Sequence, residues 1–246
     1  MIPYFQFLTI SLGPITLQVW GLFVAFGILI GAWTAARMAK RRGLDQAIVW
    51  DVAVWVVVGS MIGARLFHVL VYDPQTYLWD PIQIFMIWKG GLSMFGGLIG
   101  ATIAGVWYLR RKKLNLLLWC DTLMFGLPIG IGIGRIGCFL IHDHPGTLTH
   151  FLLGVRFPDG IRHDLGLYES IYGFALAIVF FFLAKKDAKP PTYLITFLIS
   201  YGAFRLFSDF FRLLDTKYFH LTPAQYLSII LFVAGVTLWK KHSNQF

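Results

Sequence analysis

The chain has 246 residues, of which 57% are apolar, 17% are aromatic and only 13% carry a charge. Soluble globular domains average about 25% charged residues, so this composition excludes an ordinary soluble domain and predicts an all-α integral membrane protein. The formal charge of +9 is expected to set the orientation in the membrane and to attract anionic headgroups. No basic face requires a polynucleotide, so no nucleic-acid partner is expected.

Apolar runs of about 20 residues are long enough to cross a bilayer as helices. Seven such runs predict a single polytopic membrane domain over residues 1–246, with its termini on opposite sides of the membrane. The expected spans lie near residues 17–37, 49–70, 92–109, 116–138, 167–184, 192–211 and 223–239.

Lysine and arginine accumulate in the short cytoplasmic loops of membrane proteins. In this sequence they follow the first, third, fifth and seventh expected spans, in groups that begin at Arg37, Arg110, Lys185 and Lys240. The other connections carry few of them. This alternation predicts an outer N-terminus and a cytoplasmic C-terminus.

Three stretches do not fit a membrane span. Residues 1–16 are expected to form an irregular or amphipathic segment in the outer interface, and residues 79–91 a re-entrant or interfacial helix. Residues 139–166 concentrate histidine and aspartate and predict a small outer head between spans four and five. At the outer end of the second span, Arg65 and His68 either cap the helix or place a cation at membrane depth for function.

Glycine recurs at every fourth position in the fourth expected span. Gly126, Gly130 and Gly134 share one helical face, where another backbone or a lipid chain can lie closely. The face leads to Arg135. An arginine at membrane depth indicates a polar cavity or a bound anion, and an arginine that snorkels to nearby headgroups is the alternative.

A polar stripe marks the end of the sixth expected span. Tyr201, Arg205, Ser208, Asp209 and Arg212 are spaced by three and four residues and therefore share one helical face. Arg205 and Asp209 either neutralise each other as a structural pair or belong to a site that faces the glycine stripe.

Glu169 begins the fifth expected span. Its carboxylate either favours the helix N-terminus or pairs with Arg135 or Arg162 in a polar chamber.

Two arginines on separate spans suit a phosphodiester, because each guanidinium offers paired donors and stays charged. A lipid phosphate that enters sideways would meet Arg135 and Arg205, with its acyl chains along glycine-lined helix faces. The same arginines would stabilise negative charge on a phosphate leaving group.

A nucleophile from outside needs a nearby base, and the candidates are His142, Asp143, His144 and Tyr201. The His-Asp-His string is also a metal-ligand candidate, although three adjacent residues rarely supply three ligands in good geometry. Cys138 is an alternative covalent nucleophile, but a thiol at the end of an apolar helix is usually inert without an activating base.

The string Gly134-Arg-Ile-Gly-Cys-Phe, followed by Gly146, resembles the signature of the bacterial phosphatidylglycerol:prolipoprotein diacylglyceryl transferases. Other similar segments follow the family's order over nearly the whole chain, and seven spans with an outer N-terminus also agree. These segments are Trp20-Gly21, Gly63-Ala-Arg-Leu66, Trp88-Lys-Gly-Gly91, Gly96-Gly-Leu-Ile-Gly100, Asp121, Leu167-Tyr-Glu169, Tyr201-Gly-Ala-Phe-Arg205 and Gln225-Tyr-Leu-Ser228.

The resemblance implies a multi-pass enzyme of the bacterial cytoplasmic membrane. Its partners would be phosphatidylglycerol and preprolipoprotein signal peptides: the diacylglyceryl group moves to the lipobox cysteine thiol and glycerol phosphate is released. No metal or dissociable cofactor is implied. Arg135 and Arg205 match the family's phosphate-handling arginines, and Tyr201 matches its tyrosine on the same helix. The expected catalytic residues are Arg135, Arg205, His142, Asp143, His144 and Tyr201, and the expected lipid-binding residues are Arg135, Arg205, Gly96, Gly97, Gly134, Gly137, Gly146, Glu169 and Asp209.

Some positions depart from the family pattern. Phe95 stands where the family has a histidine that is a proposed base, Cys138 replaces an asparagine, and Asp143 and Asp209 replace glutamates. Trp20 replaces a tyrosine. We therefore expect a divergent but active transferase whose base has moved to His142 or His144, oriented by Asp143. The alternatives are a phospholipid-binding or transport relative and a transferase with another acceptor.

Overall fold

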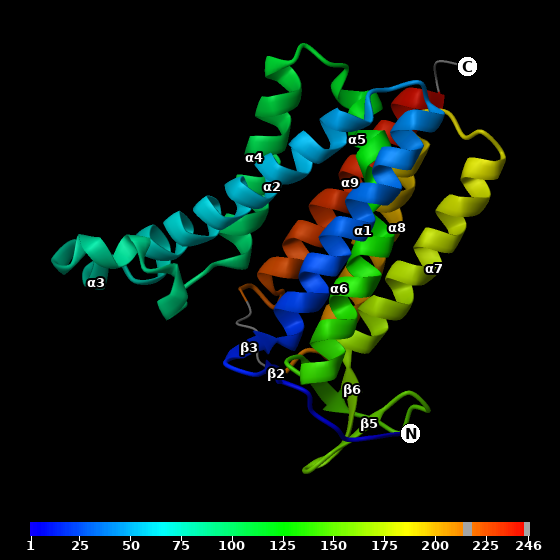
Figure 1. Ribbon diagram of the computed structural model, residues 1–246. Helices are drawn as coiled ribbons and strands as arrows, with labels where there is room; N and C mark the ends of the chain where they lie inside the picture. Colours follow the sequence, from blue (N-terminus) through cyan, green and yellow to red (C-terminus); the bar gives the residue numbers. More distant parts are fainter. Residues whose placement is uncertain (214–217, 244–246) are drawn as a thin grey trace. The chain divides into compact units, whose positions relative to one another are not determined.

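A computed structural model describes residues 1–213 and 218–243 of the chain. The described residues belong to two compact units, of which the first comprises Met1–Met38 with Cys120–Phe246 and the second comprises Ala39–Trp119. Helices dominate both units (Figure 1). This agrees with the helical membrane protein that the composition predicts.

The first unit is a bundle of long helices that run alongside one another (Figure 1). Its aromatic core includes Phe180, Tyr193 and Phe197, each at most 6% exposed. Helix α8 packs along α9, and α6 along α7. The helices are α1 (Val19–Arg41), α5 (Leu116–Met124), α6 (Leu127–Ile141), α7 (Leu165–Lys185), α8 (Thr192–Ser208), the short η4 (Asp209–Phe211) and α9 (Pro223–Ser243).

Helices α5 and α6 meet at an angle of 43°. Pro128 lies in the first turn of α6, and a proline has no N–H to bond the preceding turn, so a continuous helix cannot pass through it. The expected fourth span is therefore a bent pair of helices.

The expected outer head, residues 139–166, contains a small sheet with strand order β1-β5-β6-β4. The expectation of an irregular N-terminal segment is wrong for two parts of it: β1 joins this sheet parallel to β5, and β2 pairs with β3 as a hairpin. Gly13, with φ of +63°, supplies the hairpin turn. The strands are β1 (Ile2–Pro3), β2 (Thr9–Leu12), β3 (Ile15–Gln18), β4 (Pro145–Leu148), β5 (Val155–Phe157) and β6 (Gly160–Asp164).

The second unit is built on the pairing of α2 with α4, which glycines make possible. A Cβ on Gly59 or Gly63 would collide with the backbone of Gly96 or Gly100, so the two helices touch backbone to backbone. The elements are α2 (Gln46–Phe67), η1 (His68–Tyr72), α3 (Pro74–Trp79), η2 (Pro81–Phe85), η3 (Ile87–Lys89) and α4 (Met94–Arg111).

Arg65 organises the connection between α2 and α4. Its guanidinium is surrounded by carbonyl oxygens: Nε donates to Ile84 at 2.9 Å, Nη1 to Gly90 at 2.5 Å and to Gly91 at 3.0 Å, and Nη2 to Gln83. Residues 79–91, expected as a re-entrant or interfacial helix, are short 3₁₀ turns wrapped around this side chain. Arg65 therefore does more than cap a helix.

Five helical segments within the described residues are long and apolar enough to cross a membrane, or six if the bent pair α5–α6 counts as one span. The chain is therefore a multi-pass membrane protein. Helix α4 forms at the third expected span, but it is not one of these segments. The segments are Val19–Arg41, Gln46–Tyr72, Leu165–Lys185, Thr192–Phe211 and Pro223–Ser243.

Candidate active site

The glycine face of α6 lies against the backbone of α1. A Cβ on Gly27 would come within 2.5 Å of the Gly130 carbonyl oxygen, and one on Gly31 within 3.0 Å of the Gly126 oxygen. The face therefore receives a second backbone, which was one of the two possibilities that its spacing allowed. Further along α6, a Cβ on Gly134 would have Val24 Cα of α1 as its nearest neighbour, at 4.0 Å.

Another set of contacts brings α7 close to α6. Gly132 and Gly173 meet backbone to backbone, and the Ser170 hydroxyl donates to the Gly132 carbonyl at 2.8 Å. Because α7 lies so near α6, Glu169 on α7 reaches the side chain of Arg135 on α6.

Glu169 is the centre of a charged cluster between three helices. Its Oε2 lies 2.7 Å from Arg135 Nε on α6, and its Oε1 accepts a hydrogen bond from Arg205 Nη1 on α8. The Glu169 side chain is 1% exposed and that of Arg205 is 7% exposed, whereas Arg135 retains 22%. Of the two partners expected for Glu169, Arg135 is therefore the one that it contacts. The other, Arg162, pairs with Asp159 in the head at 2.7 Å.

Asp209 extends the cluster at the end of α8. Its Oδ1 lies 3.3 Å from Arg205 Nη2 and 3.8 Å from Arg212 Nε, and its side chain is fully buried. The i,i+4 pair expected of Arg205 and Asp209 is therefore present as part of a larger cluster. Among the described residues, Arg135, Arg205 and Arg212 thus lie around the carboxylates of Glu169 and Asp209.

Tyr201 lies one turn before Arg205 on α8 and interacts electrostatically with Glu169 and Arg135. Its ring stacks on Phe197, with centroids 5.1 Å apart. The tyrosine therefore belongs to the charged cluster, as the helical spacing of the polar stripe predicts.

Cys138, one turn after Arg135 on α6, is buried. Arg135 Nη1 donates a weak hydrogen bond to its sulfur at 3.7 Å. The arginine thus has a carboxylate at its Nε and a thiol at one of its terminal nitrogens.

His142 and His144 have different surroundings. The His142 side chain is fully buried, its Nδ1 lies 2.6 Å from Asp164 Oδ2, and its ring is surrounded by aromatic rings that include Tyr4 at 5.0 Å. His144 is 25% exposed, and its Nδ1 lies 2.6 Å from Asp143 Oδ1. The histidine that Asp143 contacts is therefore His144.

Gly146 and Gly137 lie where a side chain would not fit. A Cβ on Gly146 would come within 2.9 Å of the Phe211 carbonyl oxygen, and Gly146 forms a backbone bridge to Arg212. A Cβ on Gly137 would lie 2.9 Å from Phe23 Cβ. Gly146 thus ties the head to the end of α8, and Gly137 allows close contact with α1.

Gly96 and Gly97 are described within the second unit, in the first turn of α4. Ser93 caps this helix by accepting from the Gly96 N–H at 3.4 Å. Gly96 contacts the backbone of Gly63, and a Cβ on Gly97 would lie 3.1 Å from the Ser60 hydroxyl. Both glycines pack α4 on α2, and Phe95 beside them is partly buried.

Two residues that the sequence reasoning did not select join the cluster or the head. Thr222 donates a hydrogen bond to Asp209, and Asp164 both contacts His142 and caps α7 by accepting from the Leu167 N–H at 2.9 Å. The signal for Thr222 was present as the helix-start pattern Thr-Pro-Ala-Gln. No local pattern indicated the partner of His142.

The apolar helices define a multi-pass membrane protein, and a buried cluster of arginines and carboxylates lies between three of these helices. The family profile described as prolipoprotein diacylglyceryl transferase matches residues 8–240. The chain belongs to this family.

Relatives in three bacteria carry the name phosphatidylglycerol–prolipoprotein diacylglyceryl transferase. The protein of Bartonella bacilliformis is 37% identical over 230 residues, which are 86% of this chain and 81% of that protein. The Geobacter sulfurreducens protein is 32% identical over 96% of this chain and 95% of its own length. The Nitrosomonas europaea protein is 35% identical over 96% of this chain and 89% of its own length. The similarity therefore extends over nearly the full chain.

Proposed function

We propose that this chain transfers the diacylglyceryl group of phosphatidylglycerol to the lipobox cysteine thiol of preprolipoproteins, the first step of lipoprotein maturation. The thiol sulfur forms a bond to the glyceryl carbon as the bond from that carbon to the phosphate oxygen breaks. Glycerol phosphate leaves with the bonding electrons, and the thiol proton passes to a base. The reaction as proposed uses no metal or dissociable cofactor.

The observation that carries this proposal is the bridge of Glu169 between Arg135 and Arg205. The two arginines that match the family's phosphate-handling positions come from different helices and share one buried carboxylate. In the proposed complex the lipid phosphate binds to the remaining guanidinium donors, and the arginines stabilise the charge on the departing glycerol phosphate. Glu169 and Asp209 hold the arginines in place.

The glycines of the proposed lipid site act through backbone approach. Gly137 allows α6 to lie close to α1, Gly134 leaves the face of α6 next to Arg135 without a side chain, and Gly146 joins the head to the residues after α8. Gly96 and Gly97 pack α4 on α2, and their N–H groups already donate to Ser93, so we propose that any part they take in lipid binding is to hold these two helices together.

For the base, the geometry favours His144 over His142. A histidine acts as a base when one ring nitrogen is free and the other is oriented by a carboxylate. Asp143 lies within 2.6 Å of His144, which is partly exposed, whereas His142 is enclosed by aromatic rings. Tyr201 is the candidate for orienting the phosphate or the thiol from within the cluster.

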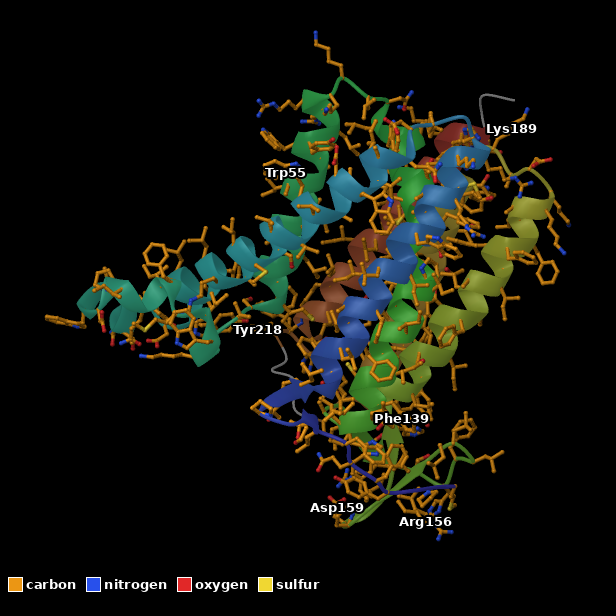
Figure 2. The ribbon with its side chains drawn as sticks, in the orientation of Figure 1. Trp55, Phe139, Arg156, Asp159, Lys189 and Tyr218 are labelled. Carbon is orange, nitrogen blue, oxygen red and sulfur yellow. The ribbon has the colours of Figure 1, made fainter. Side chains whose placement is uncertain are left out.

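In the bacterial cytoplasmic membrane we propose seven spans, with α4 as the third and the bent pair α5–α6 as the fourth. The N-terminus and the head face outward, and the C-terminus lies in the cytoplasm. The support is the charge distribution. In the first unit, Lys189 lies at the opposite end from Arg156 and Asp159 of the head (Figure 2).

The test is mass spectrometry of a synthetic lipobox peptide incubated with purified protein and phosphatidylglycerol. The peptide should gain the mass of one diacylglyceryl group. Arg135→Ala and Arg205→Ala should each remain folded but should not produce this gain. Near-native turnover in both variants would contradict the proposal that Arg135 and Arg205 bind the lipid phosphate. If the wild-type chain binds lipid and gives no product, a binding relative or another acceptor is favoured, and Phe95→His is the first variant to assay.

A further inference from the structure

Thr222 connects the start of α9 to the charged cluster. The residue is 1% exposed and directly precedes Pro223, the first residue of α9. Its Oγ1 accepts the Gln225 backbone N–H at 3.1 Å, and its own N–H donates to Gln225 Oε1 at 3.0 Å. These reciprocal bonds form a capping box, in which threonine and glutamine satisfy each other's backbone amides.

The capping box fixes the direction of the Thr222 hydroxyl hydrogen. Because Oγ1 already accepts the Gln225 N–H, the hydroxyl hydrogen is available to a different partner. That partner is Asp209 Oδ2, which accepts the hydroxyl. Thr222 Oγ1 therefore takes part both in the cap of α9 and in a hydrogen bond to a carboxylate of the charged cluster.

The hydroxyl leaves the other oxygen of Asp209 to the arginines. Oδ1 lies 3.3 Å from Arg205 Nη2 and 3.8 Å from Arg212 Nε. If Oδ2 lost its donor, a buried carboxylate oxygen would be unsatisfied, and the carboxylate would turn to engage Arg205 with both oxygens. The arginine donors would then be drawn away from a bound phosphate.

We propose that Thr222 is a positioning residue that acts through Asp209 to aim Arg205 at the phosphodiester of the lipid substrate. This inference rests on the proposed transferase function, in which Arg205 contacts that phosphate. Thr222 itself touches no reacting atom. Its hydroxyl holds Asp209 Oδ2 at the cap of α9, so that Asp209 Oδ1 faces the arginines.

The experiment measures transfer to a lipobox peptide at increasing mole fractions of phosphatidylglycerol in mixed micelles, with the full-length chain. Thr222→Val should lower kcat/KM by roughly tenfold, mainly through a higher KM for the lipid. Thr222→Ser, which keeps the hydroxyl, should remain within about twofold of wild type. If the valine variant does not fold, Thr222→Ala replaces it in comparison with Thr222→Ser.

A matched control lies on the same helix, where the Thr237 hydroxyl donates to the carbonyl of Val233 one turn earlier, at 2.7 Å. Thr237→Val should leave KM unchanged. A role limited to the helix cap would lower the thermal midpoint of Thr222→Val and leave KM unaltered, and this result would overturn the proposal.

A double-mutant cycle with Asp209→Asn supplies the second criterion. If Thr222 acts through Asp209, adding Thr222→Val to Asp209→Asn should cause little further loss, whereas independent roles give additive losses. Additive losses would reject the inference. Absence of product from the wild-type chain would instead reject the transferase function itself, so the two failures are distinct.

Discussion

Glu169 Oε2 lies 2.7 Å from Arg135 Nε, and both side chains come from helices held together by glycine contacts. Glu169 is also the only glutamate of the chain. A buried ion pair contributes little net stability, because desolvation offsets the attraction, but removal of one partner leaves a buried charge uncompensated. The main contribution of Glu169 is therefore to hold Arg135 and Arg205 at fixed positions.

Replacing Glu169 by glutamine should both destabilise the protein and slow transfer. The neutral amide leaves Arg135 and Arg205 to repel each other, so we expect a loss of about 3 kcal/mol or more in the free energy of unfolding. Transfer activity should fall at least about tenfold. Thermal unfolding in detergent and the peptide assay measure the two effects.

The control for this substitution is Asp159→Asn, which removes an exposed carboxylate paired with Arg162 in the head. Exposed ion pairs contribute little net stability because solvent screens them, so this variant should behave like wild type. Equal effects of the two substitutions would contradict a special role for Glu169.

The contact between α1 and α6 provides a second prediction. Gly27→Ala places a methyl group 2.5 Å from the Gly130 carbonyl oxygen, so the helices must separate. Overpacking of this kind costs about 1–3 kcal/mol, and the shift should also displace Arg135, which follows Gly130 by five residues on α6. We expect a lower thermal midpoint and reduced transfer.

Gly21→Ala is the matched control on α1, since its added methyl group would have its nearest neighbour at 3.9 Å. This variant should retain the stability and activity of wild type. If Gly27→Ala were as stable as Gly21→Ala, the close backbone contact between α1 and α6 would be refuted.

His163 makes the stability of the head depend on pH. Burial lowers the pKa of this histidine from its ordinary value of 6.5, and its Nδ1 lies 2.8 Å from the Tyr168 hydroxyl. A histidine whose folded pKa is depressed favours the neutral form, so the unfolded state binds more protons at acid pH. The contribution of His163 is therefore complete above pH 6.5 and is lost as the pH falls below that value.

This predicts that the thermal midpoint decreases from pH 7.5 to pH 5 more in wild type than in His163→Gln, whose side chain does not titrate. His150→Gln, which replaces an exposed histidine of the same region, is the matched control for the loss of a histidine side chain. An identical pH dependence for wild type and His163→Gln would show that His163 does not contribute.

The sequence predicted the helices well because apolar runs and charge clusters are local properties. It also placed Arg205, Asp209 and Tyr201 on one face, since helical spacing determines this. It left the partner of Glu169 open, because the choice between Arg135 and Arg162 depends on how α6 and α7 pack. The aromatic surroundings of His142 likewise include Tyr4, which is distant in sequence.

The short strands were missed for a related reason. Strand β1 has two residues and β5 has three, too few to show the alternation that identifies a strand. Their pairing depends on a contact between the N-terminus and the head. The capping box of Thr222 was visible in the sequence, but its bond to Asp209 is a tertiary contact.

The carbonyl cage of Arg65 leads to a further prediction. The planar guanidinium donates in several directions to the connection between α2 and α4, and a lysine ammonium cannot reproduce this fork. Arg65→Lys should therefore loosen residues 79–91 although the charge is kept. We expect faster amide hydrogen exchange in that segment, measured by mass spectrometry.

The corresponding control is Arg110→Lys, at the exposed end of α4. It should leave hydrogen exchange in residues 79–91 unchanged. Unaltered exchange in Arg65→Lys would mean that the charge alone is sufficient and that the directed hydrogen bonds contribute little.

The proposed orientation is tested by two tags. Lysines 185, 186 and 189 follow α7 or lie at its end, and positive residues are retained in the cytoplasm during insertion. A fluorescent protein fused after residue 246 should therefore fold and fluoresce inside the cell. A short epitope inserted at the exposed turn between β5 and β6, beside Asp159, should bind antibody added from outside once the outer barrier is opened. If the C-terminal reporter were reached from outside, the proposed orientation would be wrong. The head, with His144 and Asp143, would then lie in the cytoplasm, where an exported lipoprotein precursor could not present its thiol.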